Sequence, residues 1–191
     1  MALLPIYTYG TSILRKKAKP ITAITDEIIT LIRNMFETMH YSSGIGLAAN
    51  QVGSSHKILV VDISEMEGYE EVKPLVVINP RIVKHAGELE MEEGCLSIPG
   101  IRSNVKRAES ITIHFADANF NEVTLEADEL LARVILHEVD HLNGILFTDH
   151  IPKDEYKKIL PELKEIEKGI VDSDYEVVTA VDEKKPKKKR K

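Results

Sequence analysis

The sequence has very little cysteine and no long apolar run. Cys95 is the single cysteine among 191 residues, so no internal disulfide is possible. No apolar stretch reaches the length of a membrane span. The first ten residues, MALLPIYTYG, lack the cationic stretch and long apolar run of a secretory signal. These absences predict a soluble, cytoplasmic protein that does not bind a membrane.

Basic residues are scarce except at the C-terminal end. Seven of the 25 Lys and Arg residues fall within the last eight positions, KKPKKKRK, which leaves 18 basic against 31 acidic residues elsewhere. Such an acidic body argues against broad nucleic-acid binding by the domain itself. Because 43% of the residues are hydrophobic, the rest of the chain is suited to an ordinary domain with a core.

Helical periodicity is clear in three places. A wide apolar stripe predicts an amphipathic helix over 25–41, with Thr25 as its N-cap. A second helix is predicted over 128–143, between a capping Asp128 and a terminating Gly144, and a third, polar helix over 153–168 contains Pro161.

Strand patterns lie between the first two helices. Pro80 interrupts one strand, and two strands form a hairpin; the predicted strands are 57–63, 74–83, 87–92, 111–115 and 123–125. The order of helix, strands and helix predicts an α+β fold. We expect one catalytic domain over 1–170, which includes the C-terminal helix, and a charged, flexible tail over 171–191.

The second helix carries the strongest chemical signal, the HEVDH sequence at 137–141. His137 and His141 are four residues apart and therefore lie on one face of a helix, where both imidazoles can hold one metal ion. Glu138 can reach water at that ion as a general base. Two incidental histidines are the alternative, but the spacing, the apolar face and the capped helix favour a metal.

A catalytic metal site needs a third protein ligand and one open position. Downstream, the sequence offers only weakly placed candidates such as His150 and Glu155. Upstream lies Cys95 within EGCLS, whose thiolate suits a soft or borderline ion. The predicted ligand set is therefore Cys95, His137 and His141.

Three motifs in this order resemble those of peptide deformylases, and in particular of the bacterial type I branch. They are GIGLAANQ at 44–51, EGCLS at 93–97 and HEVDH at 137–141. The resemblance runs from near the N-terminus to Phe147. It implies antiparallel sheets packed around a central HExxH helix. The visible departure is Leu136, where many members have Gln before the first histidine.

The resemblance also implies an activity, namely hydrolysis of the N-formyl group from the initiator methionine of nascent chains. The ion would be Fe²⁺, with Zn²⁺, Ni²⁺ or Co²⁺ as substitutes. Glu138 would transfer the proton of water to the leaving amine. The side chain of Gln51 and the backbone N–H of Leu96 would stabilise the oxyanion.

The resemblance further implies a groove for N-formylmethionyl peptides. Ile45, Gly46 and Gly94 would pair with the peptide backbone. Leu130 and Val134 would contact the methionine side chain, and Arg102 would lie near the peptide beyond it. Asp140 is expected either to orient a ligand histidine or to pair with Arg133, and a structural role is favoured for both.

Two other functions share part of this pattern. A general zinc endopeptidase has HExxH but takes its third ligand from downstream, so Cys95 argues against it. A non-catalytic metal-binding protein keeps the histidines but has no need of Glu138 or Gln51.

The basic tail predicts a contact with the ribosome. The resemblance implies docking through the helix after the active-site domain, where five lysines precede KKPKKKRK. The alternatives are a solubilising tail and a nuclear-import signal. If the tail binds RNA, removing residues 184–191 should weaken co-sedimentation with ribosomes and lower its salt dependence, because phosphate contacts release counterions. Superimposable binding curves for both forms would contradict this.

Overall fold

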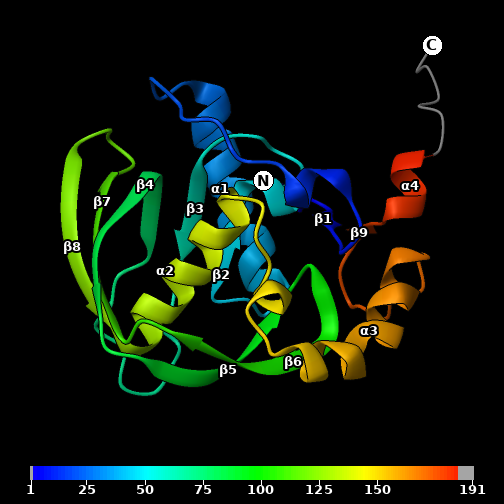
Figure 1. The fold of residues 1–191 in the computed structure, drawn as a ribbon. Coiled ribbons are helices and arrows are strands. Elements are labelled where there is room, and N and C mark those ends of the chain that lie inside the picture. Colours follow the sequence, from blue (N-terminus) through cyan, green and yellow to red (C-terminus); the bar gives the residue numbers. More distant parts are fainter. Residues whose placement is uncertain (1, 185–191) are drawn as a thin grey trace, which may run out of the picture.

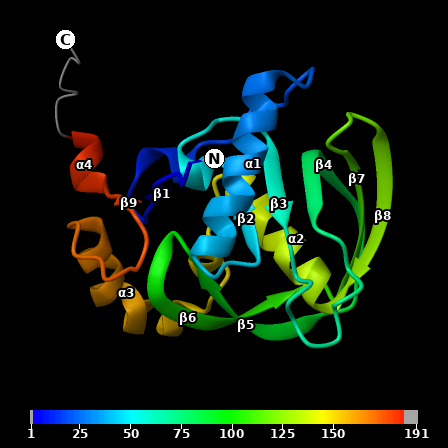
Figure 2. The ribbon, with the colours of Figure 1, turned by 180° about the vertical axis from the view of Figure 1, so that it is seen from behind.

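A five-stranded antiparallel sheet forms the frame of the protein (Figures 1 and 2). The computed structural model describes residues 2–184. In spatial order the strands are β2 (Gly46–Ala48), β3 (Ile58–Val61), β4 (Leu75–Ala86), β7 (Ser110–Ala116) and β8 (Glu122–Asp128). Helix α2 (Glu129–Leu142) packs on one face of this sheet and α1 (Asp26–Tyr41) on the other.

Strand β3 shows why helices cover both faces. Its four residues are all buried, and successive strand side chains point to opposite faces. Leu59 and Val61 pack in the cluster that contains α2, whereas Ile58 and Val60 pack in the cluster that contains α1. Because both faces of this strand are apolar, both must be covered by other apolar elements to be removed from water.

Helix α1 forms where the periodicity predicted it. Its buried side chains recur at helical spacing and are Ile28, Ile32, Met35 and Met39. The hydroxyl of Thr25 accepts a hydrogen bond from the backbone N–H of Ile28, which confirms the predicted cap.

Helix α2 is the central helix, and it is buried on most of its surface. Asp128 occupies its N-cap position, but the Asp128 side chain makes no capping hydrogen bond. Beyond its end, Gly144 has φ +78°, the left-handed conformation expected of a helix-terminating glycine.

A second hairpin lies along the end of α2 (Figure 1). It pairs β5 (Leu89–Cys95) with β6 (Ile98–Arg107). The sequence predicted β5 but gave no strand for β6. Helix α3 (Lys153–Glu167) packs against β6 and continues through Pro161. The remaining short helices are η1 (Ser12–Arg15), η2 (Ala49–Val52) and η3 (Phe147–Asp149).

The predicted hairpin of β7 and β8 is confirmed, with an unbroken register from Ser110–Asp128 to Ala116–Glu122. The interruption predicted at Pro80 is also present. The pairing of β4 with β7 shifts between Ile78 and Arg81, where Pro80 has no N–H to donate.

The segment after α3 differs from the predicted flexible tail. Its described part contains β9 (Val177–Val178) and α4 (Ala180–Lys184), and β9 pairs in parallel with β1 (Ile6–Tyr7). This pairing was not predicted, because the partner strand of β9 lies at the opposite end of the chain. Residues 185–191 of the basic tail lie outside the described residues.

Within residues 2–184, no helix combines the length and the apolar character needed to cross a membrane.

Gly144 offers a test of how the end of α2 is held. A Cβ added there would lie 2.7 Å from the backbone oxygen of Arg15, whereas one added at Gly68, with a similar φ of +86°, would meet nothing within 4 Å. We expect Gly68→Ala to cost about 1 kcal/mol of unfolding free energy through its φ alone. Gly144→Ala should cost about 1–3 kcal/mol more through overpacking. Denaturant titration of both variants measures the difference; equal losses would contradict the close contact.

Candidate metal centre and substrate cavity

One face of α2 presents the two histidines of the HEVDH motif. His137 and His141 are separated by one helical turn, and their ring centroids are 4.9 Å apart. Both residues are buried, and burial lowers the pKa of His141 well below its usual value. A neutral imidazole is the form that ligates a metal.

Cys95 reaches the histidines from the end of β5. Its Sγ lies 3.1 Å from Nε2 of His141. The potential ligand atoms of Cys95, His137 and His141 all lie within 4.8 Å of one another. The hairpin thus brings the cysteine to a helix that follows it by some forty residues in the sequence.

The three donors fit a borderline divalent ion. One thiolate and two imidazoles suit Zn²⁺ or Fe²⁺ better than Mg²⁺ or Ca²⁺, which prefer oxygen ligands. A second observation agrees with this fit. Oε2 of Glu138 is buried without a hydrogen-bond partner among the described residues, so a polar group is left for a ligand beside the donors.

A buried carboxylate fixes the first histidine. Oε2 of Glu93 lies 2.8 Å from Nδ1 of His137, which leaves Nε2 for a metal. Arg107 donates to Glu93 through Nε at 2.6 Å and Nη2 at 3.0 Å, and Arg133 donates through Nη1 at 2.7 Å. Burial alone would raise the pKa of Glu93, but the hydrogen bonds from His137 and Arg107 hold it well below its usual range.

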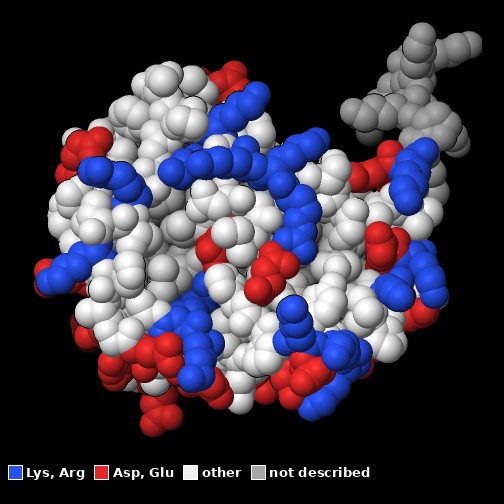
Figure 3. Space-filling view, viewed as in Figure 1, with Lys and Arg blue, Asp and Glu red and all other residues white. Residues whose placement is uncertain are grey.

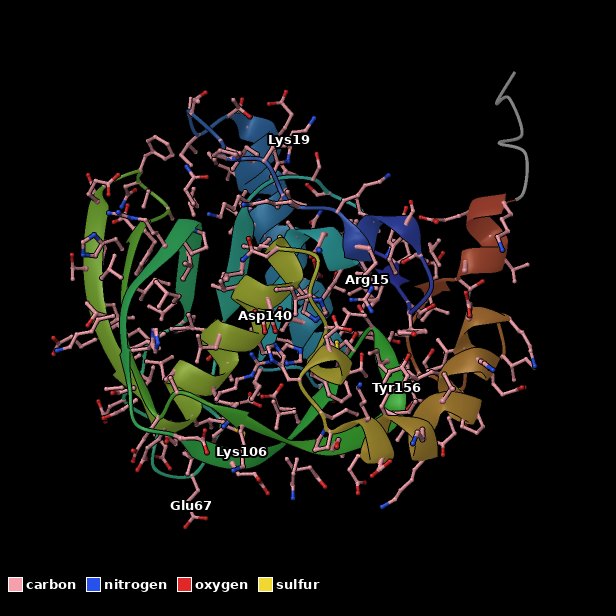
Figure 4. The ribbon with its side chains drawn as sticks, in the orientation of Figure 1. Arg15, Lys19, Glu67, Lys106, Asp140 and Tyr156 are labelled. Carbon is pink, nitrogen blue, oxygen red and sulfur yellow. The ribbon has the colours of Figure 1, made fainter. Side chains whose placement is uncertain are left out.

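Asp140 takes part in the same network through Arg107. Its Oδ2 accepts a hydrogen bond from Nη1 of Arg107 at 2.5 Å and lies 2.7 Å from Nε2 of His150 (Figure 4). The pairing of Asp140 with Arg133, left open by the sequence, does not occur. Arg133 instead contacts Glu93 and the backbone oxygens of Val105 and Leu89.

The side chain of Gln51 is oriented toward Cys95 by the backbone of Ala48. Its Oε1 accepts a hydrogen bond from the N–H of Ala48 at 2.7 Å. Its amide nitrogen therefore faces the centre, 3.6 Å from Sγ of Cys95 and 3.3 Å from Oγ of Ser97. This arrangement leaves a side-chain donor beside the potential ligands.

Glu138 lies against the backbone of β2. A Cβ added at Gly46 would meet Oε1 of Glu138 and Cγ1 of Val134, both at 2.7 Å, so glycine is required for this close approach. Burial raises the pKa of Glu138 to about 7. A carboxyl group with this pKa can both accept and return a proton near neutral pH.

These groups line one cavity of about 610 Å³. Apart from buried His141, every residue that the sequence predicted for the site lines it: Ile45, Gly46, Gln51, Gly94, Cys95, Leu96, Arg102, Leu130, Val134, His137 and Glu138. Arg102 lies at the exposed rim, where it pairs with Glu92 at 3.6 Å.

Sequence reasoning missed several groups around the cavity. Glu93 belongs to the EGCLS motif but received no role, and nothing in the sequence linked Arg107 to it. Asn50 donates to the backbone oxygen of His141. Tyr175 donates from its hydroxyl to the backbone oxygen of Leu96 at 2.8 Å, from a segment predicted to be a tail.

Two histidine donors on an HExxH helix and a cysteine donor at the end of β5, with a buried carboxylate and a cavity beside them, define a metal-dependent hydrolase. The family model of polypeptide deformylase matches residues 3–157. The chain is 49% identical to the peptide deformylase of Chlorobium luteolum over 175 residues, which cover 92% of each chain. It belongs to the polypeptide deformylase family.

Solved structures agree with this membership. The peptide deformylase of Legionella pneumophila matches with a TM-score of 0.80 and 36% identity, over 87% of this chain and 96% of that one. The enzyme of Synechococcus elongatus, solved in complex with actinonin, matches with a TM-score of 0.77 and 40% identity, over 84% and 86% of the two chains.

The Glu93 network provides a test of the support behind the metal centre. Glu93→Gln removes a buried negative charge and leaves the buried guanidinium groups of Arg107 and Arg133 without their shared carboxylate partner. We therefore expect a loss of about 3–5 kcal/mol of unfolding free energy. Metal affinity should fall about 10- to 100-fold because His137 loses its partner. The matched control is Glu92→Gln, whose exposed ion pair is worth at most about 1 kcal/mol. Denaturant titration and metal competition measure both, and equal behaviour of the two variants would contradict the network's role.

Proposed function

We propose that this chain hydrolyses the formyl group from the N-terminal methionine of newly made polypeptides and releases formate. The observation that carries the proposal is one cavity in a member of this family. The cavity is lined by Cys95, His137, Glu138 and Gln51, and the donor atom of buried His141 lies within 4.8 Å of those of Cys95 and His137.

Cys95, His137 and His141 would hold the ion, for which we propose Fe²⁺, with Zn²⁺, Ni²⁺ or Co²⁺ as substitutes. When bound, a divalent ion supplies Lewis acidity, which lowers the pKa of water and polarises a carbonyl group. Glu93 keeps His137 in the tautomer that this requires, because its carboxylate accepts a hydrogen bond from the N–H at Nδ1.

Glu138 moves the proton in this reaction. Burial raises the pKa of its carboxyl group above the usual value, toward neutrality. It therefore accepts a proton from the attacking water and returns it to the amine that leaves when the C–N bond breaks. Its unpartnered Oε2 leaves an acceptor for that water.

Gln51 and Leu96 stabilise the negative charge that develops on the formyl oxygen. The amide nitrogen of Gln51 is already turned toward the centre, because the N–H of Ala48 holds its oxygen. The backbone N–H of Leu96, directly after Cys95, is the second donor. Fixed donors of this kind stabilise a transition state without reorganisation.

The substrate lies along the apolar part of the cavity. Leu130 and Val134, on α2, contact the methionine side chain, and Ile45, Gly46 and Gly94 pair with the peptide backbone. Arg102, at the rim, lies beside the residues that follow methionine. A formyl carbon bears only hydrogen, so a cramped site admits it more readily than an acetyl group.

The described structure argues against a general zinc endopeptidase. That class takes its third ligand downstream of HExxH, but His150 is engaged with Asp140, and Glu155 with Lys158 on the surface of α3. Cys95 occupies the position of a third donor instead.

We further propose that the enzyme acts in the cytoplasm, on chains emerging from the ribosome. Helix α3 offers limited positive charge for docking, since Lys157, Lys158 and Lys168 pair with acidic neighbours. Figure 3 shows basic and acidic side chains intermixed where α3 lies, at the lower right. Ribosome binding therefore depends on the basic residues at the C-terminal end.

A formate-release assay tests the proposed activity. We expect the anaerobically purified, metal-loaded protein to release formate from formyl-Met-Ala-Ser and to act far more slowly on acetyl-Met-Ala-Ser. Metal analysis of the same sample identifies the ion. Equal rates on the two peptides would contradict the assignment and favour a broader amidase.

Variants separate metal binding from proton transfer. Cys95→Ala, His137→Ala and His141→Ala should each lose the metal. Glu138→Ala should keep it but turn over about 10²–10⁴-fold more slowly, since it lacks the proton acceptor. Gln51→Ala should keep it and lose about 10²–10³-fold. Metal content and kcat are measured on each protein, and a fully metallated, fully active Cys95→Ala would remove the thiolate from the ligand set.

A further inference from the structure

The link between α3 and β9 supplies one wall of the substrate cavity. Asp172, Ser173, Asp174 and Tyr175 line the same cavity as the metal donors. Both views of the fold show this link passing beside the turn between β5 and β6 (Figures 1 and 2). The link lies outside residues 3–157, the part of the chain that the family model matches.

Tyr175 fastens this link to the turn that carries Leu96. Its hydroxyl donates to the backbone oxygen of Leu96 at 2.8 Å. On the next residue of the turn, the backbone oxygen of Ser97 accepts from the N–H of Tyr9 at 2.8 Å. Two hydrogen bonds from distant segments thus hold the turn whose Leu96 N–H is the proposed second donor to the oxyanion.

Both ends of the link are also fixed. Val171 packs on the hydrophobic cluster that contains α3. At the other end, β9 pairs with β1 in the register Ile6–Val177. Only five residues, 172–176, lie between these anchors, so the wall has little freedom to move away from the cavity.

The exposed side chains of the wall are acidic. Exposure alternates along the link, so Asp172 and Asp174 face solvent while Ser173 and Tyr175 are partly buried. Across the rim, the guanidinium of Arg102 already lies 3.6 Å from Glu92. The other arginine of the cavity, Arg133, is held by buried Glu93. Negative charge therefore exceeds positive charge at the mouth.

We propose that Asp172 and Asp174, held in place by Tyr175, make this enzyme prefer formylated peptides that carry Lys or Arg shortly after the methionine. The proposal rests on the proposed deformylase function. It concerns the substrate residues that follow methionine and extend out of the cavity while formyl-Met is bound inside it. Tyr175 is a positioning residue, since it acts on the substrate through the Leu96 turn.

A peptide series tests the charge preference. The wild-type enzyme is assayed on formyl-Met-Ala-Lys, formyl-Met-Ala-Glu and formyl-Met-Ala-Ala amides. We expect kcat/KM to be about three- to tenfold higher for the Lys peptide than for the Glu peptide, the range that two exposed carboxylates can supply. The ratio should approach one at high salt, because such charges are screened.

The double variant Asp172→Asn/Asp174→Asn should bring the Lys-to-Glu ratio close to one at low salt. Its matched control is Glu122→Gln/Glu126→Gln on β8, which changes the net charge equally but does not line the cavity. The control should keep the wild-type ratio. The proposal would be overturned if the double variant kept the wild-type Lys-to-Glu ratio, or if the control variant lowered that ratio equally.

Tyr175→Phe tests the anchor. We expect kcat on the neutral peptide to fall about three- to tenfold, with a smaller change in KM, because one hydrogen bond that orients the Leu96 turn is lost. The Lys-to-Glu ratio should fall as well. The control is Tyr156→Phe, which removes a hydroxyl bonded to that of Tyr9 away from the cavity and should keep wild-type kinetics. If Tyr175→Phe keeps both the wild-type kcat and the wild-type Lys-to-Glu ratio, the hydroxyl of Tyr175 contributes neither to turnover nor to the charge preference.

The outcome for the wild-type enzyme separates this proposal from the function on which it rests. A protein that releases no formate from any of the three peptides fails as a deformylase, and the preference fails with it. A protein that deformylates all three peptides at equal rates remains a deformylase, and only the preference is overturned.

Discussion

The arrangement of the metal centre depends on one buried carboxylate, that of Glu93. It lies 2.8 Å from His137 and accepts hydrogen bonds from Arg107 and Arg133. A charge buried this deeply is costly unless several partners surround it. The hairpin, the central helix and the metal donors must therefore be assembled together, because each contributes one member of the network.

The same constraint explains how β5 can present Cys95 to a helix far along the chain. Glu93 and Cys95 are two residues apart and are both held by interactions with α2, the first through His137 and Arg133, the second beside His141. From the other face of the helix, the missing side chain of Gly46 lets Glu138 lie against β2. The centre is thus fixed between two sheet segments rather than carried by the helix alone.

The proposed function and the charge preference come from different layers of this structure. Donors and proton carriers lie on α2 and at the end of β5, inside the part matched by the family model. The acidic wall belongs to the link after α3, and the hydroxyl of Tyr175 fastens it to the turn that carries Leu96. Catalysis requires the rigid inner layer, whereas discrimination between peptides can be adjusted at the outer one.

The sequence by itself determined the helices, the hairpin of β7 and β8, the break at Pro80 and the grouping of His137, Glu138 and His141, because helical and strand periodicity are local properties. It also singled out Cys95 through the need for a third metal ligand, and Gln51 through motif resemblance. Only the tertiary structure decided that Asp140 pairs with Arg107 instead of Arg133, that Glu93 is the shared partner, and that Tyr175 closes the cavity. These contacts join residues far apart in the chain, and their side chains show no periodicity or spacing that reveals a distant partner before the chain is folded.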